Sequence, residues 1–153
     1  MNYMNYKNIE LTNLENIASQ VVKLILENRT NKEEKKEGSG FVIYLEGEMG
    51  AGKTTIAQKI GQALGIKDNM QSPTFTLMRE YSLENSLYEK LIHVDAYRFE
   101  NKKEGNILKL NENKNGNIIL IEWQKNMHAP NANMIVHLEK VNEYMRDINV
   151  ELK

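Results

Sequence analysis

The stretch GEMGAGKTT, residues 47 to 55, places glycines, a lysine and two hydroxyls at a spacing that suits phosphate binding. It fits the pattern Gly-x4-Gly-Lys-Thr, with Gly47, Gly52, Lys53 and Thr54 in the fixed positions. Glycine allows backbone angles that turn several N–H groups toward one anion, at the start of a helix whose dipole favours negative charge. We expect Lys53 to reach the β- and γ-phosphates and the Thr54 hydroxyl to ligate Mg²⁺. The loop therefore predicts a nucleoside triphosphate site.

Two acidic residues directly follow apolar runs and are candidates for the chemistry beside this loop. Asp95 follows LIHV, and Glu122 follows IILI. A phosphate-binding loop of this kind needs one carboxylate to hold Mg²⁺ and one residue to orient the attacking water, and both suit the carboxyl ends of buried strands. An acid that closes an apolar run is also a common strand-end residue, so the loop in the same chain is what favours the catalytic interpretation.

Two further sites carry polar groups that could assist. The stretch SPTFT, residues 72 to 76, follows the loop's helix, where nucleotide switches place a hydroxyl that senses the γ-phosphate. By itself it is also consistent with a plain turn before a strand. His93 would share the face of Asp95 in a strand, and the pattern favours a hydrogen-bonded structural histidine over a nucleotide contact. His128 and His137 have no metal-ligand spacing with it.

The elements that must position these groups follow from hydrophobic periodicity. Helical spacing predicts helices over 12–26, with Thr12 and Glu15 as a capping box, and over 53–64. Apolar runs and alternation predict strands over 41–45, 75–81, 87–99, 117–122, 134–140 and 147–153. Polar segments at 27–40 and 100–117 predict a solvated connector and a poor helix or mobile loop. The order predicts an α/β fold, a P-loop NTPase-type three-layer sandwich with a mixed sheet flanked by helices.

Length and composition restrict the functional classes. A chain of 153 residues predicts a single domain over 1–153. The net charge of −1 provides no basic field for RNA or DNA, so any nucleic-acid role would be indirect and run through a partner. There is no cysteine for thiolate chemistry and no apolar run of about 18 residues to span a membrane. The first residues, MNYMNYKNIEL, lack a secretory pattern, so we expect a cytoplasmic location.

Together these motifs resemble one known family. GEMGAGKTT, SPTFTL (72–77) with Tyr81, HVDAYRF (93–99) and IEW (121–123) occur in the order and approximate spacing of TsaE, the bacterial P-loop ATPase of tRNA threonylcarbamoyladenosine biosynthesis. The likeness extends over roughly residues 10 to 150. The glycine loop alone is generic, whereas its combination with the other three motifs is specific.

The resemblance implies an Mg²⁺-dependent ATPase, with ATP and ADP as ligands, that works with the partner proteins TsaD and TsaB. These install a threonylcarbamoyl group beside the anticodon of tRNAs that read ANN codons, and hydrolysis would support their turnover. It implies Lys53, Asp95 and Glu122 as catalytic residues and Thr54 with Glu122 at the metal. The implied nucleotide-binding residues are Glu48, Met49, Gly50, Ala51, Gly52, Lys53, Thr54, Thr55, Thr76 and Trp123.

One departure and two alternatives remain open. After the Tyr-Arg pair the family usually carries an acidic helix with Glu-Glu-Leu, whereas segment 100–117 is rich in Asn and Lys. The docking geometry toward partners is therefore open, while the ATP site is unaffected. A small-molecule kinase would share the loop but needs an arginine-bearing lid, and this chain has four arginines. A nucleotide-gated binding module would share the whole site and differ only in whether turnover matters.

Overall fold

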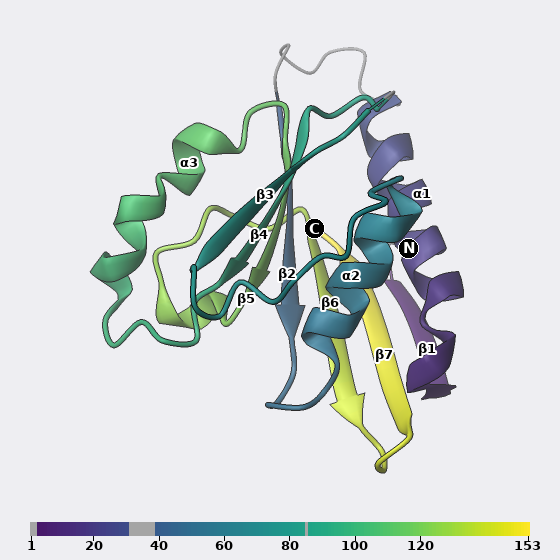
Figure 1. Cartoon of the computed structure of the whole chain (residues 1–153). Helices are drawn as coiled ribbons and strands as arrows, with labels where there is room; N and C mark the ends of the chain where they lie inside the picture. Colours follow the sequence, from purple (N-terminus) through teal and green to yellow (C-terminus); the bar gives the residue numbers. More distant parts are fainter. Residues whose placement is uncertain (1–2, 31–38, 85) are drawn as a thin grey trace.

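The computed structural model describes residues 3–30, 39–84 and 86–153, which form one mixed β-sheet with helices on both faces (Figure 1). In the described residues the sheet has seven strands in the order β1-β7-β6-β2-β5-β4-β3. The strands are β1 (Tyr3–Glu10), β2 (Phe41–Glu46), β3 (Met78–Ser82), β4 (Lys90–Asp95), β5 (Ile118–Glu122), β6 (Met134–Lys140) and β7 (Met145–Leu152). The predicted α/β class with a mixed sheet is confirmed.

The centre of the sheet is parallel and is covered on both faces. β2 pairs in parallel with β5 and β6, and β5 pairs in parallel with β4. Every residue of β5 is buried, as its continuous apolar run predicts for a strand with both faces covered. In this register Leu45 lies opposite Glu122, and Glu122 lies opposite Asp95. The two acids therefore emerge side by side at the edge where β2 enters the glycine loop.

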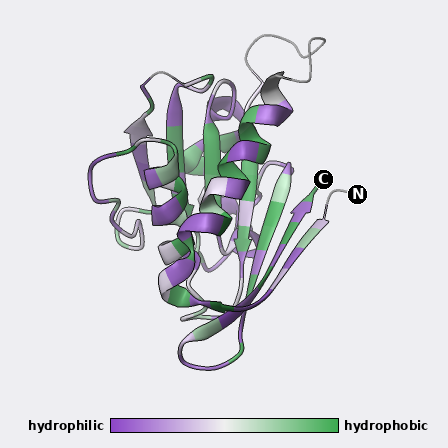
Figure 2. Cartoon of the chain, turned by 90° about the vertical axis from the view of Figure 1, so that its right-hand side faces the viewer, coloured by the Kyte–Doolittle hydropathy of each residue, from purple (hydrophilic) through white to green (hydrophobic). Residues whose placement is uncertain are grey.

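One face of the sheet carries the helices α1 (Glu15–Thr30) and α2 (Lys53–Ala63). The apolar stripe of α1 includes Ala18, Val21 and Ile25, which are fully buried, and Figure 2 shows apolar residues alternating with hydrophilic ones along the helix. α1 begins at Glu15 rather than at Thr12, because a short 3₁₀ turn, η1 (Leu11–Asn13), precedes it. The Leu11 N–H donates to the Tyr144 carbonyl at 2.9 Å, which holds this turn against the β6–β7 hairpin.

The opposite face is covered by short helical segments in the region predicted as a poor helix or mobile loop. These are η2 (Lys102–Leu108) and α3 (Leu110–Asn113), followed after β5 by η3 (Gln124–Asn126). A capping box starts η2, since the Asn101 side chain accepts from the Glu104 N–H and the Glu104 carboxylate accepts from the Asn101 N–H. Leu110 and Phe99 are buried in the core on this face.

Both predicted antiparallel hairpins are present, but some of their strands are shorter than the sequence predicts. β3 and β4 are antiparallel, as are β6 and β7. β3 starts at Met78 rather than at residue 75, because the Thr76 N–H closes a turn on the Pro73 carbonyl and Leu77 has a φ of 65°. The predicted strand over 87–99 is shorter too, and only 90–95 pair. The predicted connector begins later than expected since α1 reaches Thr30, and residues 31–38 of it lie outside the described part.

β1 is an element that the sequence did not predict. It pairs antiparallel with β7 at the edge of the sheet. Its inward side chains are Met4, Tyr6 and Ile9, and the register shifts between the last two. This irregularity, at which Asn8 has a φ of 53°, breaks the strict alternation by which a half-buried strand is recognised. Within the described residues, no helix is long and apolar enough to cross a membrane.

Truncation of a buried side chain on β5 measures how strongly the stability of the fold depends on the packing of this strand. We expect Leu120→Ala to lower the free energy of unfolding by about 2 to 5 kcal/mol, because Leu120 is fully buried and the deletion leaves a cavity. Leu87→Ala is the matched control, since Leu87 is 48% exposed and should change stability by less than about 0.5 kcal/mol. Urea unfolding followed by circular dichroism measures both, and equal losses in the two variants would contradict this account of the core.

Candidate nucleotide-binding site

The glycine loop between β2 and α2 has the backbone of an anion-binding turn. Gly50 and Gly52 have φ angles of 79° and 104°, in the left-handed region that residues with a Cβ rarely adopt. A Cβ on Gly52 would also lie 2.9 Å from the Leu11 side chain. Gly52 is the N-cap of α2, and no described side chain caps that end, so the first amide groups of the helix are available to a ligand. The loop and helix therefore meet the requirements for binding phosphate oxygens.

Lys53 is held close to the loop from which it projects. Its ammonium donates to the carbonyls of Gly47 and Glu48, the latter at 3.2 Å, and lies 3.9 Å from the centre of the Trp123 ring. Burial lowers the pKa of Lys53, and the nearby carboxylates of Glu122 and Asp95 partly oppose that shift. Trp123 directly follows β5 with a φ of 59°, an uncommon conformation for a bulky residue. This turn places the indole against the lysine.

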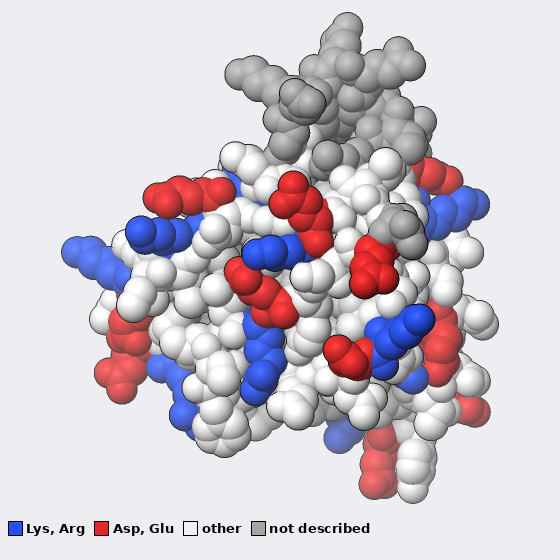
Figure 3. All heavy atoms as spheres, turned by 45° about the horizontal axis from the view of Figure 1, so that its top comes forward, with Lys and Arg blue, Asp and Glu red and all other residues white. Residues whose placement is uncertain are grey.

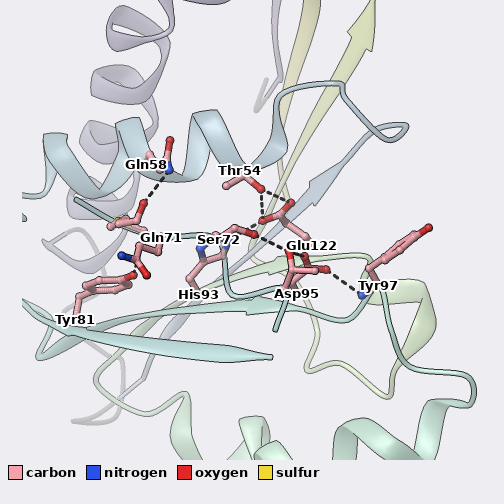
Figure 4. Close-up of polar contacts among 11 residues, drawn as sticks. Thr54, Gln58, Gln71, Ser72, Tyr81, His93, Asp95, Tyr97 and Glu122 are labelled. Atoms are coloured by element: carbon pink, nitrogen blue, oxygen red, sulfur yellow. Dashed lines mark hydrogen bonds and ion pairs between the residues drawn. The ribbon is translucent and has the colours of Figure 1, made fainter. Parts of the chain in front are cut away.

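Glu122 is the centre of a buried polar chain (Figure 4). Its two carboxylate oxygens accept from the Thr54 hydroxyl, at 3.1 and 3.2 Å, and one of them lies 2.7 Å from Nε2 of His93. Both Glu122 and His93 are almost completely buried. The His93 Nδ1 has no hydrogen-bond partner among the described residues. In the tautomer with its proton on Nε2, the ring donates to Glu122, and the unpaired Nδ1 is an acceptor and not a donor. His93 thus acts as the structural histidine that the sequence favours, and its partner is the candidate metal ligand.

Asp95 lies beside Glu122 but is tied to different elements. Its Oδ2 accepts from the Thr74 hydroxyl at 3.0 Å, and its Oδ1 accepts from the Tyr97 N–H at 2.9 Å. Asp95 is also buried. Glu122 is therefore joined to the helix that follows the glycine loop, whereas Asp95 is joined to the SPTFT segment. This difference supports separate tasks for the two acids.

The SPTFT segment is anchored where it begins and open at its tip. Before it, the Gln58 side chain donates to the Met70 carbonyl at 2.8 Å, and the Gln71 N–H donates to the Tyr81 hydroxyl at 3.3 Å. At the tip Phe75 is 83% exposed. The segment can therefore respond to a ligand at Thr74 without losing its attachment to α2 and β3.

These groups surround one hollow of about 370 Å³. It is lined by Leu11, Met49, Gly50, Gly52, Lys53, Thr54, Thr55, Thr74, Asp95, Tyr97, Glu122 and Trp123. A second hollow of about 460 Å³ lies on the other side of Lys53 and Trp123, and Glu48 and His137 line it. The larger space lacks both Thr54 and the two acids. The chemistry therefore belongs to the smaller one.

Most of the predicted site residues meet in this place, and three do not line it. Glu48 faces the second hollow, Ala51 is buried within the loop, and Thr76 is exposed. The hydroxyl of the SPTFT segment that reaches the site is that of Thr74, whereas the sequence analysis chose Thr76. The choice between them depends on the turn that closes at residue 76, which has no sequence signature strong enough to select one hydroxyl.

A buried residue outside the motifs also contacts the loop. Arg146 of β7 donates from Nε to the Ala51 carbonyl at 2.8 Å and from Nη2 to the Gly50 carbonyl at 3.0 Å. It belongs to none of the sequence motifs that predict the site. A signal was present, because Arg146 shares the parity of Ile148 and Val150 in an alternating strand and so belongs to its buried face.

The oxygen ligands at this site suit Mg²⁺ that is held jointly by protein, phosphate and water better than a metal ion that is held by protein side chains alone. Among the described residues, no cluster of three or more histidine, cysteine or acidic side chains could hold an ion. The Thr54 hydroxyl and the Glu122 carboxylate are hard oxygen ligands next to the phosphate-binding loop. Mg²⁺ at nucleotide sites is typically held by one or two such groups together with phosphate oxygens and water. The residues present fit this requirement.

Comparisons with known proteins find similarity to one family. The family model described as "Threonylcarbamoyl adenosine biosynthesis protein TsaE" matches residues 10–148. The chain is 32% identical to the tRNA threonylcarbamoyladenosine biosynthesis protein TsaE of Aquifex aeolicus over 114 residues, 73% of this chain and 77% of that protein. It is 42% identical to the protein of that name from Bacillus subtilis over 85 residues, 55% and 51% of the two chains.

The extent of these matches differs. For the TsaE protein of Haemophilus influenzae, identity is 32% over 102 residues, 65% of this chain and 63% of that protein. The chain thus spans between half and two thirds of the length of several relatives. A crystal structure of Bacillus subtilis YdiB superposes with a TM-score of 0.64 at 21% identity, covering 99% of this chain and 86% of that one. That likeness shows a shared fold.

A double-mutant cycle tests the contact between His93 and Glu122. We expect His93→Leu to lower the free energy of unfolding by about 1 to 3 kcal/mol, because the buried carboxylate loses a donor. In a Glu122→Gln background the same change should cost less, with a coupling of about 0.5 kcal/mol or more. Urea unfolding of the four proteins measures the cycle. Strictly additive free energies would show that the two side chains do not interact.

Proposed function

Since the chain belongs to the TsaE family, we propose that it is an Mg²⁺-dependent ATPase of tRNA threonylcarbamoyladenosine biosynthesis. The observation that carries the proposal is the gathering of Lys53, Thr54, Asp95 and Glu122 around one hollow at the glycine loop. These four side chains come from α2, β4 and β5. They supply a cation, a hydroxyl and two carboxylates, which phosphoryl transfer from ATP to water requires.

The loop and Lys53 would bind the phosphates. The amide groups at the start of α2 face the oxygens of the β- and γ-phosphates, and the Lys53 ammonium exchanges its carbonyl contacts for these oxygens. Its lowered pKa reflects poor solvation in a buried setting, and a polyphosphate chain would supply the missing negative charge. We therefore expect the phosphates of ATP to replace the loop carbonyls as partners of Lys53.

The Thr54 hydroxyl and the Glu122 carboxylate would hold Mg²⁺. When bound, Mg²⁺ would supply positive charge that neutralises the negative charge developing on the phosphate oxygens. The direct contact between Thr54 and Glu122 puts the two oxygen ligands on one side of the phosphate loop. His93 fixes the orientation of the Glu122 carboxylate from within the sheet. Asp95 is the second carboxylate, and it would orient the attacking water.

The SPTFT segment would report the state of the nucleotide. Thr74 donates to Asp95 and lines the same hollow, so its hydroxyl would lie near the γ-phosphate and the attacking water. Loss of the γ-phosphate would change the contacts of Thr74 and hence of the exposed tip at Phe75. This offers a partner protein a surface that differs between ATP and ADP.

We further propose that TsaD and TsaB are the partners, that hydrolysis supports their turnover and that the location is the cytoplasm. The net charge of −1 supports indirect contact with tRNA. The face shown in Figure 3 carries acidic and basic side chains interspersed, without a broad basic area. A protein of this charge would therefore rely on the partner pair to hold the nucleic acid.

Hydrolysis by the chain with and without TsaD and TsaB tests the proposed activity. We expect the pair to stimulate hydrolysis and Lys53→Ala to lower the rate about 100-fold or more, since it removes a preorganised cation from the phosphates. Lys59→Ala is the matched control, because Lys59 is on the same helix but pairs with Glu15 at the surface. A colorimetric phosphate assay measures each rate.

The outcomes separate the possible roles. An unchanged rate in Lys53→Ala would overturn the assignment of the ATPase site. Equal binding of the pair with ATP, ADP and a non-hydrolysable analogue would contradict a role for the SPTFT segment in sensing nucleotide. Nucleotide-dependent binding without turnover would identify a gated binding module instead.

Trp123 provides a direct report of nucleotide binding. It is the only tryptophan in the sequence, and Lys53 lies over its ring. Because phosphates would draw the ammonium away, we expect saturating ADP with Mg²⁺ to change the emission of Trp123. Titration followed by fluorescence measures the change, and Trp123→Phe should abolish the signal. An unchanged spectrum in protein shown by calorimetry to be saturated would mean that Lys53 stays on the ring.

A further inference from the structure

Arg146 is a buried cation that lies behind the glycine loop and outside every motif discussed above. It is 2% exposed and comes from β7, where the β6–β7 hairpin approaches the loop (Figure 1). Among the described residues, no carboxylate lies within ion-pair distance of it. Its partners are all backbone carbonyls, those of Gly50, Ala51, Asn142, Glu143 and Met145. Buried arginines are normally paired with an anion, so this arrangement calls for a specific explanation.

The two loop carbonyls that Arg146 binds belong to consecutive peptide groups. The orientation of these peptide groups decides which N–H groups of the loop point toward a ligand. In a trans peptide the C=O and N–H point in opposite directions. The Ala51 carbonyl, held by Nε, shares its peptide with the Gly52 N–H. Arg146 does not line the hollow of 370 Å³, whereas Gly52 does. Holding the carbonyl from behind therefore directs the Gly52 N–H toward the phosphate side.

The neighbouring peptide is held at both ends. The Gly50 carbonyl accepts from Nη2, and the N–H of the same peptide, that of Ala51, donates to the Glu48 carbonyl at 3.0 Å. Gly50 and Gly52 flank Ala51 and both have left-handed φ angles. Glycine imposes little steric barrier to rotation of an adjacent peptide, so these planes need an external constraint to keep one orientation.

We propose that Arg146 is a positioning residue that fixes the Ala51–Gly52 peptide so that its N–H binds phosphate. The planar guanidinium suits the task because two of its donors reach two adjacent carbonyls in one geometry. Its charge also polarises the peptide and strengthens the amide as a donor to an anion. The bound polyphosphate, on the opposite side of the peptide, supplies the anion that Arg146 lacks in the free protein. This inference rests on the proposed nucleotide site.

Binding of Mg²⁺-ADP and of tripolyphosphate to three variants tests the proposal. Arg146→Gln removes the positive charge and the paired N–H donors of the guanidinium, and we expect both ligands to bind about tenfold more weakly or worse. Arg146→Lys keeps the positive charge but lacks the paired donors, and its affinity for both ligands should lie between those of the wild type and Arg146→Gln. Asn142→Ala is the matched control, since the Asn142 side chain accepts from the N–H groups of Tyr144 and Met145 and does not touch the loop.

The control separates positioning from mere support of the hairpin. Asn142→Ala should lower the unfolding midpoint and leave both dissociation constants within about twofold of the wild type. Equal weakening by Asn142→Ala and Arg146→Gln, or wild-type affinity in Arg146→Gln, would overturn the proposal. Failure of the wild-type protein to bind either ligand would instead overturn the proposed nucleotide site.

A measurement on the wild type covers the case in which Arg146→Gln does not fold. In ¹H–¹⁵N spectra we expect the Arg146 Nε–H signal to be protected from exchange and to shift together with the Gly52 amide when tripolyphosphate is added. Chemical rescue is a separate test: added guanidinium should restore ligand affinity to Arg146→Gly at concentrations that do not change the ligand affinity of Asn142→Ala. Rapid exchange of the Nε–H in the ligand-bound protein would contradict a fixed contact with the loop.

Discussion

Parallel pairing of β2, β5 and β4 is the constraint on which the candidate site depends. Because the three strands run the same way, they end at one edge of the sheet, and the residue that closes each run emerges there. The register places Asp95 directly opposite Glu122. A slip of one residue would turn either acid to the other face, break the contacts of Glu122 with Thr54 and His93, and exchange the side chains that β5 packs into the two cores on either side of the sheet. The hydrophobic core thus determines the geometry of the polar site.

Polar groups at that edge are buried, and each has a partner that prevents a large desolvation penalty. Glu122 is bound by Thr54 and His93, and Asp95 is bound by Thr74 and the Tyr97 amide. These partners also connect the acids to different parts of the chain. Thr54 belongs to the phosphate-binding helix, and Thr74 belongs to the segment whose tip is exposed. The hydrogen bonds that offset the desolvation cost of the two buried acids are therefore the ones that a bound nucleotide would change.

The free protein also holds Lys53 and the glycine loop in a defined arrangement. Lys53 is retained by loop carbonyls and by the Trp123 ring, and Arg146 binds the loop from the hairpin side. The loop thus has cations on two sides. Preorganisation of this kind reduces the ordering that phosphate binding would otherwise require, at the cost of a less stable free protein.

The sequence by itself determined the class of fold and predicted the glycine loop and the two acids as a site, because each depends on residues close along the chain. A glycine loop between a strand and a helix, and an acid after an apolar run, are recognisable from neighbouring residues alone. Only the tertiary structure decided that Thr74 rather than Thr76 meets Asp95, that His93 binds Glu122, and that β1 completes the sheet. Arg146 and Ala51 are 95 positions apart, and their contact depends on how β7 passes the loop. Local patterns carry no information on such a distance, because strand order and register arise from packing of the whole chain.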